Sequence, residues 1–273
     1  MVNLTHLDDP LFDGADATKR DLIDYLEAIA DRLIGQLRDR PLSVIRVRAG
    51  QKPFMQKNVP DYAPDWIKTV SLWAQSSSRE VRYALCDDKD TLIWFGNQRA
   101  VEYHPTLSLA GSPDRPSHLV LDIDPPEGAA FGKAVGAAKL VERALSDIGL
   151  SGAVKTSGSK GVHIYVPVDA SAEDAAAATR AIAARAEQLD PDLATTAFIK
   201  ADRGGKVFID STRAGGATVV AAYSPRIRPG VQVSFPVAWD SLDDVSPSDF
   251  TMRTAPGLLG DKDPWAAALP EPQ

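Results

Sequence analysis

Two carboxylates stand one residue apart in the apolar run HLVLDIDPPEG, residues 118–128. Because side chains alternate along a strand, Asp122 and Asp124 share one face, about 6.6 Å apart along the chain. Their mutual repulsion indicates a nearby cation, and one divalent ion, or two at roughly 4 Å, would relieve it. The available ligands are hard oxygen atoms, which favours Mg²⁺ or Mn²⁺ over zinc. A DxD pattern is also common at exposed strand ends, so the spacing by itself leaves both interpretations open.

A third carboxylate, Asp210, ends the apolar segment KVFID at residues 206–210. At the end of a strand it is placed to complete a metal-binding cluster with the first two acids. For an isolated strand-terminal Asp, the alternative is that it caps a turn. His104, in the segment VEYHP, ends another predicted strand and is expected to reach the same cleft from the preceding part of the chain.

The segment TSGSKG, residues 156–161, is predicted to be a tight loop between two strands. Its backbone N–H groups and the side chains of Ser157 and Lys160 are suited to holding an anion, with Gly161 allowing the turn. It is not a P-loop, because the GxxxxGK[ST] spacing and the following helix are absent. His163 follows on the face opposite Val162, so it is either a hydrogen-bonded polar residue or part of the same site.

A further segment contains two arginines that are suited to binding phosphate groups. In YSPRIR, Arg226 and Arg228 lie on one side of an extended segment, as a pair suited to triphosphate oxygens.

The segment KPFMQK places Phe54 and Met55 between Lys52 and Lys57. An aromatic residue with basic flanks is expected where a base stacks beside a phosphate track. Packing of Phe54 in the core is the equally ordinary alternative.

The elements that position these residues can be read from hydrophobic periodicity. Helices are predicted at residues 18–37, near 131–148 and at about 171–189, with Thr18 as the first N-cap. Strands are predicted at 42–50, over 70–96 around a polar SSSR tip and a DDKD turn, and at 118–124, 153–158, 162–168, 206–210 and 218–224. Residues 104–117 are a connector. The β-α-β-β-α-β order after residue 118 predicts an RRM-like module, residues 118–273, beside an N-terminal α+β module, residues 1–117.

The composition is that of an ordinary globular protein of 273 residues, 44% hydrophobic and 25% charged. The net charge is −7, which argues weakly against a nucleic-acid partner on average. Two basic stretches nevertheless lie inside acidic ends, which indicates a local polyanion site or solvated charged faces. The stretches comprise Arg32, Arg38, Arg40, Arg46, Arg48, Lys52 and Lys57, then Lys200, Arg203, Lys206, Arg213, Arg226 and Arg228.

No secretory signal or membrane-spanning apolar run is visible, and a cytoplasmic protein is predicted. The single cysteine, Cys86, excludes an internal disulfide and a site built from several cysteines.

Taken in order, these blocks resemble the archaeo-eukaryotic primase superfamily, specifically the polymerase domain of bacterial ligase D and its stand-alone relatives. The resemblance covers nearly the whole chain, from TKRDLIDYL through HLVLDIDPPEG and TSGSKGVHIYVPV to AYSPRIRPGVQVSFPVAWDSL. It implies one catalytic domain over residues 1–273, with two α+β modules, the second RRM-like and carrying the metal-binding acids. The implied activity is template-directed nucleotidyl transfer that fills short gaps or extends ends in double-strand break repair.

The resemblance also implies roles for individual residues. Asp122, Asp124 and Asp210 match metal-binding acids, for two divalent ions with Mn²⁺ preferred to Mg²⁺. The residues matching the nucleotide-binding set are Phe54, Met55, His104, Ser157, Lys160, Gly161, His163, Arg203, Arg226 and Arg228. The residues expected to contact DNA are Lys19, Arg46, Arg48, Lys52 and Lys57. The implied partners are gapped or primer-template DNA and NTPs or dNTPs, often ribonucleotides, with DNA ligase and end-binding repair proteins. A monomer located at the nucleoid is expected.

The chain departs from the family pattern at several positions. Asp9 stands where relatives tied to ligase D have a lysine that recognises a 5′-phosphate, although Lys19 matches a second such lysine. Met55 replaces the second residue of a Phe-Phe pair, and Ser211 and Ala214 replace a larger residue and an Asn. These changes leave the predicted chemistry intact but affect 5′-phosphate recognition and template stacking, and Asp9 predicts weaker dependence on a gap's 5′-phosphate.

Two other classes of function account for part of the same residues. A non-catalytic module that binds DNA ends or gaps and recruits repair partners would bind DNA in a salt-sensitive way without incorporating nucleotides. A glycosyltransferase would explain the DID segment as a nucleotide-sugar metal site, but it explains neither the basic stretches nor Asp210.

Overall fold

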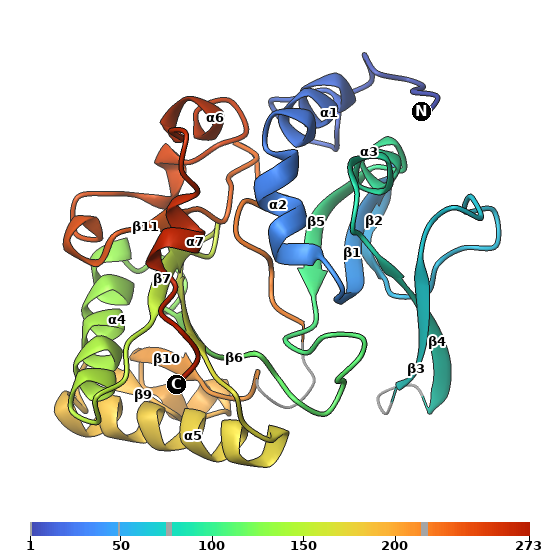
Figure 1. Cartoon of the computed structure of the whole chain (residues 1–273). Helices are drawn as coiled ribbons and strands as arrows, with labels where there is room; N and C mark the ends of the chain where they lie inside the picture. Colours follow the sequence, from blue (N-terminus) through green and yellow to red (C-terminus); the bar gives the residue numbers. More distant parts are fainter. Residues whose placement is uncertain (1, 49, 75–77, 214–217) are drawn as a thin grey trace.

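The computed structural model describes residues 2–48, 50–74, 78–213 and 218–273. They form the predicted α+β fold, with two sheets lying side by side (Figure 1). Both termini lie at the surface, the N-terminus near helix α1 and the C-terminus near the second sheet. In the described part of the chain, no helix is long and apolar enough to cross a membrane.

The first sheet has the order β2-β1-β4-β3, and a fifth strand, β5, pairs with β1. Its strands are β1 Pro41–Arg48, β2 Gln51–Gln56, β3 Thr69–Ala74, β4 Arg79–Leu85 and β5 Ala100–Pro105. Three helices belong to this half: α1 Lys19–Ala28, α2 Ala30–Leu37 and α3 Lys89–Asn97. Thr18 caps α1 as predicted, by accepting from the Asp21 backbone N–H in a capping box.

The second sheet has the order β11-β7-β8-β6-β10-β9. Its strands are β6 His118–Asp124, β7 Ala153–Thr156, β8 Val162–Pro167, β9 Ala194–Thr195, β10 Val207–Asp210 and β11 Pro236–Val237. Helices α4 Phe131–Ser146 and α5 Ala172–Leu189 pack on this sheet (Figure 1). The chain order is the predicted β-α-β-β-α-β order, with the short β9 added before the last strand.

The segment after β10 returns from the second sheet to the first. The backbone N–H of Ala221 donates to the Tyr103 carbonyl of β5 (2.9 Å), and the buried Tyr25 hydroxyl of α1 donates to the Tyr223 carbonyl (2.7 Å). The chain then closes with α6 Ala255–Leu258 and α7 Pro264–Ala268, where the enclosed Trp265 packs edge-on against Tyr165 of β8. The two halves therefore share one buried core.

Several sequence predictions were wrong in detail. The segment after the DDKD turn is the helix α3, because Asp88 accepts from the Thr91 N–H as an N-cap, and an N-cap begins a helix. The predicted helix 18–37 is divided between α1 and α2 at Ile29. Ile148 is exposed beyond the end of α4.

The predicted strand at 218–224 is also wrong, because those described residues bond to β5 and to other loops without entering a named strand. Two of the four residues of the predicted polar tip at 76–79, residues 76 and 77, lie outside the described residues.

Candidate active site

The strand register brings four polar residues into one row across the second sheet. Asp210 of β10 is directly opposite Asp122 of β6, which is opposite His163 of β8, which is opposite Lys155 of β7. Directly opposite residues point to the same face of a sheet, so these side chains lie on one face. The row therefore combines two carboxylates with two nitrogen-bearing side chains.

The carboxylates of Asp122 and Asp210 converge on a single point. One nitrogen of Arg213, Nη2, lies 2.9 Å from Asp122 Oδ2 and 3.1 Å from Asp210 Oδ2. Asp122 Oδ1 lies 3.3 Å from His163 Nε2. Burial raises the pKa of Asp122, but His163 and Arg213 outweigh burial and hold this pKa well below its ordinary value. Asp122 is therefore ionised at neutral pH.

Asp124 is turned away from this point toward other cations. Its two carboxylate oxygens lie 3.2 Å from Lys160 Nζ and 3.7 Å from Arg203 Nη1. Among the residues described, no group of three or more His, Cys, Asp or Glu side chains is close enough to hold a metal ion. The structure thus brings together two of the three predicted acids and leaves the third beside them in the same cavity.

The donor set nevertheless fits a hard divalent cation. Asp122 and Asp210 present carboxylate oxygens to one point, and the Arg213 nitrogen there shows that this point takes a positive charge. Asp210 keeps its other oxygen, Oδ1, bonded to the Thr212 N–H (2.8 Å) and hydroxyl (2.6 Å), which orients Oδ2 toward the cation.

The TSGSKG loop is closed by its own hydrogen bonds. Ser157 Oγ accepts from the N–H groups of Ser159 (3.3 Å) and Gly161 (3.1 Å). Gly158 has a positive φ of 67°, which favours glycine. A Cβ on Gly161 would lie 2.1 Å from the Ile123 carbonyl, so only glycine lets the loop pack on β6. Lys160 Nζ donates to the Pro125 carbonyl (2.8 Å), which holds this side chain beside the acids.

Two arginines approach the loop from other segments. Arg226 Nη1 donates to the Ser157 carbonyl, and Arg226 Nε lies 3.2 Å from Glu102 Oε1. Arg203 stacks on the Phe208 ring at 3.7 Å and donates to the carbonyl of Phe198 (3.0 Å).

These groups line one cavity of about 380 Å³. Its lining includes Asp122, Asp124, Asp210, Ser157, Lys160, Gly161, His163, Arg203, Arg213, Arg226 and Arg228. Of the predicted nucleotide-binding residues, this cavity contains seven: Ser157, Lys160, Gly161, His163, Arg203, Arg226 and Arg228.

Sequence reasoning did not single out Glu102, and it named Arg213 only as a member of a basic stretch. Glu102 lies on β5 and is 5% exposed, and it accepts from the Ile227 N–H (2.9 Å). Burial raises its pKa, yet the nearby His104 (2.9 Å) and Arg226 lower it to about 2. His104 was expected to reach the same cleft, but it does not line this cavity: it pairs with Glu102, which pairs with the cavity-lining Arg226. An acid inside the apolar strand segment AVEYHP was the available signal.

The predicted stacking residues lie outside this cavity, on the first sheet. Phe54 of β2 lies beneath the guanidinium groups of Arg46 (5.8 Å) and Arg48 (5.0 Å), and Met55 is 45% exposed. Arg46 is buried and donates to Gln98 and Tyr62, so its side chain is already held by the protein.

The remaining predicted DNA contacts differ in accessibility. Lys52 and Arg48 line a cavity of about 520 Å³ with Arg228, and Lys57 is half-buried. Lys19 is 2% exposed, and its ammonium donates to the Thr5 carbonyl. Burial lowers the pKa of Lys19. Its enclosure and its hydrogen bond to Thr5 make it less accessible to a phosphate than its sequence position indicates.

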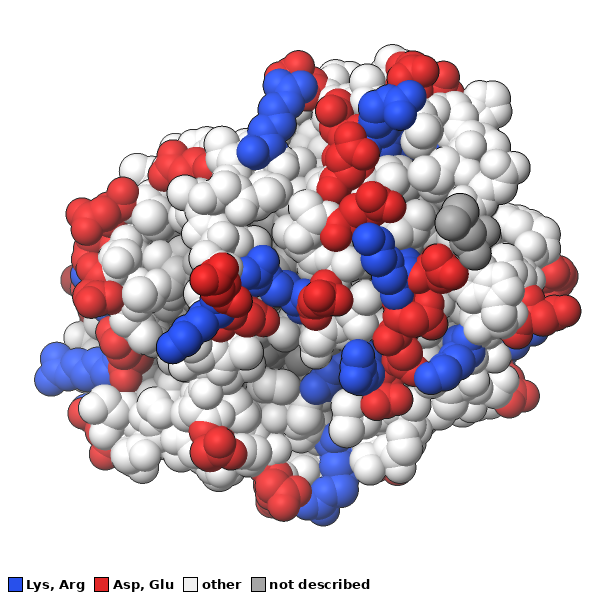
Figure 2. Space-filling model, turned by 45° about the horizontal axis from the view of Figure 1, so that its top comes forward, with Lys and Arg blue, Asp and Glu red and all other residues white. Residues whose placement is uncertain are grey.

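Figure 2 shows that Lys and Arg side chains alternate with Asp and Glu over one face of the molecule. That face is not uniformly basic. Positively charged side chains cluster instead in the cavity lined by Asp122, Asp124 and Asp210, called the acid-lined cavity below, and beside Phe54.

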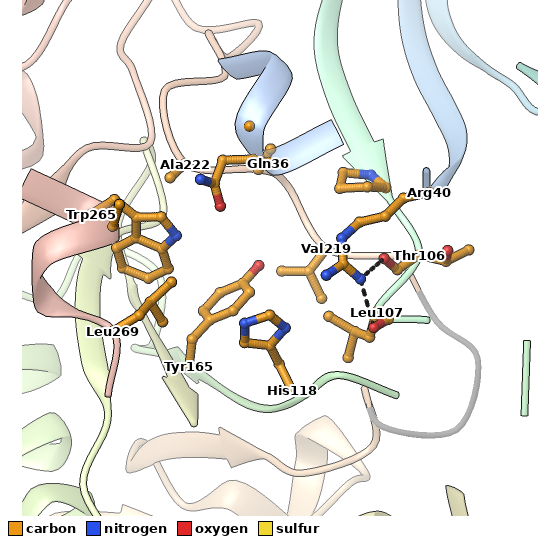
Figure 3. Close-up of a pocket in the computed structure, with 14 residues that line it drawn as sticks. Gln36, Arg40, Thr106, Leu107, His118, Tyr165, Val219, Ala222, Trp265 and Leu269 are labelled. Carbon is orange, nitrogen blue, oxygen red and sulfur yellow. Dashed lines mark hydrogen bonds between the residues drawn. The ribbon is translucent and has the colours of Figure 1, made fainter. Parts of the chain in front are cut away.

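A separate cavity of about 170 Å³ lies at the opposite end of β6, where His118 begins the strand (Figure 3). Arg40, His118, Tyr165 and Trp265 surround it, and Arg40 donates to the Leu107 carbonyl (2.8 Å). None of the predicted site residues lines this cavity.

A family model for the primase-polymerase domain of LigD matches residues 18–265. The chain belongs to this family. The LigD polymerase-domain resemblance inferred from the motifs is thus confirmed. A bifunctional non-homologous end joining protein LigD of Bacillus subtilis is 34% identical over 93% of this chain and 41% of its own length. The multifunctional LigD of Mycobacterium tuberculosis is 34% identical over 89% of this chain and 34% of its own length.

The chain therefore spans about two fifths or less of these relatives. Among solved structures, the polymerase domain from Mycobacterium tuberculosis ligase D in complex with DNA superposes with a TM-score of 0.86. That similarity covers 94% of both chains at 32% identity, which supports the α+β LigD-type fold.

The departures from the LigD pattern can be located in this structure. Asp9 pairs with Arg99 (2.8 Å), and both line a cavity of about 310 Å³ with Lys19. Ser211 follows Asp210 directly, and Ala214 lies outside the described residues.

Proposed function

We propose that this chain is a metal-dependent, template-directed nucleotidyltransferase that extends a primer 3′ end in bacterial DNA repair. The observation that carries this proposal is the single cavity in which Asp122 and Asp210 converge while Lys160 and Arg226 border the same space. Paired carboxylates beside several cations are the arrangement that nucleotidyl transfer requires. Membership of the LigD primase-polymerase family supports it.

In this proposal, Asp122, Asp124 and Asp210 hold two divalent ions, preferably Mn²⁺ or otherwise Mg²⁺. When bound, the ions would activate the primer hydroxyl and stabilise the charge on the triphosphate. Lys160, Arg203, Arg226 and Arg228 would neutralise the triphosphate, since they border the same cavity.

Other contacts extend along the first sheet. Phe54, with Met55 exposed beside it, would stack on a template base. Arg48, Lys52 and Lys57 would follow the phosphate track, and Arg46 would steady Phe54. Residues 1–117 would then serve DNA contacts and residues 118–273 catalysis, within one domain.

The finer aspects of the activity are also proposals. We expect short gaps to be filled or ends extended during non-homologous end joining, with ribonucleotides often favoured. DNA ligase and end-binding repair proteins are the expected partners of a monomeric chain at the nucleoid. The solved Mycobacterium tuberculosis relative is described in complex with DNA, which supports DNA as the partner of this chain.

The test is incorporation of labelled NTPs and dNTPs on gapped duplexes with Mg²⁺ or Mn²⁺. Replacing Asp122 or Asp124 with alanine should abolish primer extension while circular dichroism and DNA binding by fluorescence anisotropy stay near wild type. Asp240→Asn, at an exposed acid that does not line the cavity, serves as the control and should extend primers normally. Full extension by either alanine variant would refute the assignment. DNA binding without incorporation by the wild type would instead establish a non-catalytic binding module.

A further inference from the structure

Lys155 on β7 is a fully enclosed lysine, 0% exposed, in the centre of the second sheet. Its Nζ lies 2.8 Å from His163 Nδ1 and donates to Ser234 Oγ at 2.5 Å. The ammonium also lies over the Tyr165 ring, 5.5 Å from its centroid. In the described part of the chain, Lys155 has no ion pair with a carboxylate.

Burying a lysine without a paired carboxylate is energetically unfavourable, because burial disfavours the charged ammonium form. Burial and Arg226 lower the pKa of Lys155 well below its ordinary value. Lys155 lines neither the acid-lined cavity nor the cavity in Figure 3, so it does not reach a substrate directly. Any contribution to the chemistry must pass through a neighbour.

The row across the sheet identifies that neighbour. Lys155 is directly opposite His163, and His163 is directly opposite Asp122. An ionised carboxylate only accepts, and a neutral imidazole carries its hydrogen on one nitrogen alone, so that hydrogen faces Asp122 and the other nitrogen is left to accept an N–H of Lys155. The imidazole between them therefore accepts at Nδ1 and presents its hydrogen at Nε2 to Asp122 Oδ1.

We propose that Lys155 is a positioning residue that fixes the ring and tautomer of His163 and thereby orients the Asp122 carboxylate. With Oδ1 engaged by His163, Oδ2 is directed to the point shared with Asp210. Ser234 completes the support, because its hydroxyl accepts from Lys155 and donates to the Thr156 carbonyl (2.8 Å). The effect of Lys155 on metal binding rests on the proposed function. The expected tautomer of His163 does not depend on that function.

The first test measures the tautomer in metal-free protein without DNA or nucleotide. The chain has four histidines, so long-range ¹H–¹⁵N correlation spectra are simple, and His163→Gln identifies the His163 signals by their loss. The expected pattern for His163 at pH 7.5 is a protonated Nε2 and an unprotonated Nδ1. A protonated Nδ1, or an imidazolium with both nitrogens protonated, would overturn the proposal.

The second test removes the donor with Lys155→Met, which keeps most of the side-chain volume. We expect the His163 spectrum to change to a mixture of tautomers, and Mn²⁺ binding, followed by the electron paramagnetic resonance of the free ion, to weaken about tenfold, at the lower end of what outer contacts to metal ligands contribute. Lys133→Met on the exposed part of α4 is the matched control and should leave both readouts unchanged.

A folded Lys155→Met protein with the wild-type tautomer and wild-type Mn²⁺ affinity would overturn the positioning role. Should this variant fail to fold, the wild-type spectrum still decides the tautomer, and Ser234→Ala perturbs Lys155 more gently, with a smaller shift in the same direction expected. If the tautomer is as expected but no nucleotide is incorporated, the proposed function fails alone. If nucleotides are incorporated but the His163 tautomer is not the expected one, the proposed role of Lys155 is refuted and the polymerase assignment stands.

Discussion

Replacing Glu102 with glutamine should destabilise the protein by about 3 kcal/mol at pH 7. The pKa of Glu102 is lowered from 4.5 to about 2 in the folded chain, and each pKa unit corresponds to about 1.4 kcal/mol. The Glu102 side chain is almost fully enclosed, so solvent screens this interaction weakly. Glutamine keeps the size of the side chain but leaves the partly buried Arg226 guanidinium without its carboxylate, and breaking a fully buried pair typically costs about 3–5 kcal/mol, so about 3 kcal/mol lies at the lower end for this pair.

The pH dependence follows from the direction of this shift. Because the pKa is lower in the folded state, the stabilisation is present in full above about pH 4.5. It is lost as the pH falls from 4.5 toward 2. The difference between wild type and Glu102→Gln should therefore shrink progressively over that interval.

Urea unfolding followed by tryptophan fluorescence at pH 7, 5.5, 4.5 and 3.5 measures both effects. Glu27→Gln, an exposed change on α1, is the matched control and should shift the free energy of unfolding by less than about 0.5 kcal/mol. A double-mutant cycle with Arg226→Met isolates the pair, with a coupling of about 1–3 kcal/mol expected. A Glu102→Gln protein within 0.5 kcal/mol of wild type at pH 7, or a difference that is independent of pH, would refute the reasoning.

Two further predictions concern the loop and the departure at Asp9. Gly161→Ala should destabilise the chain by about 2 kcal/mol in the same urea titration, since the new Cβ would meet the Ile123 carbonyl at 2.1 Å. The control is Gly132→Ala, whose Cβ would meet nothing within 4 Å and which should be neutral or stabilising. The affinity for gapped DNA should change less than about threefold when the gap's 5′-phosphate is removed (under ~0.7 kcal/mol). The reason is that Arg99 already forms an ion pair with Asp9 and that Lys19 is enclosed. Asp9→Lys should increase that preference in fluorescence anisotropy titrations, and a strong preference in the wild type would contradict the argument.

Local patterns predicted the parts of the fold that depend on neighbouring residues in the chain. The alternation of side chains in residues 118–124 identified β6, and the loop TSGSKG identified the strands on either side of it, β7 and β8. Thr18 marked the start of α1. The error at α3 has a local cause as well. The four apolar residues 92–95 after DDKD show no clear period, and only the Asp88 cap distinguishes a helix from a strand there.

The candidate site was less predictable because it depends on register and on contacts between distant segments. Sequence spacing paired Asp122 with Asp124, whereas the antiparallel register pairs Asp122 with Asp210 and leaves Asp124 to Lys160. Lys155 appeared as an unremarkable polar residue of a strand, since its position opposite His163 exists only once β7 and β8 are paired. Burial of Lys19 was likewise invisible, because it arises from the N-terminal segment that covers it.

The charges of the site also show why the two sheets act as one unit. Glu102 belongs to β5 of the first sheet, and Arg226 belongs to the segment between β10 and β11 of the second sheet, yet the two side chains form an ion pair. Arg226 in turn holds the Ser157 carbonyl of the loop beside the acids. Dividing the chain at residue 117 would separate Glu102 from Arg226 and leave Glu102 with His104 as its only charged partner named above. The first sheet therefore contributes to the proposed catalysis through Glu102 as well as through contacts with DNA.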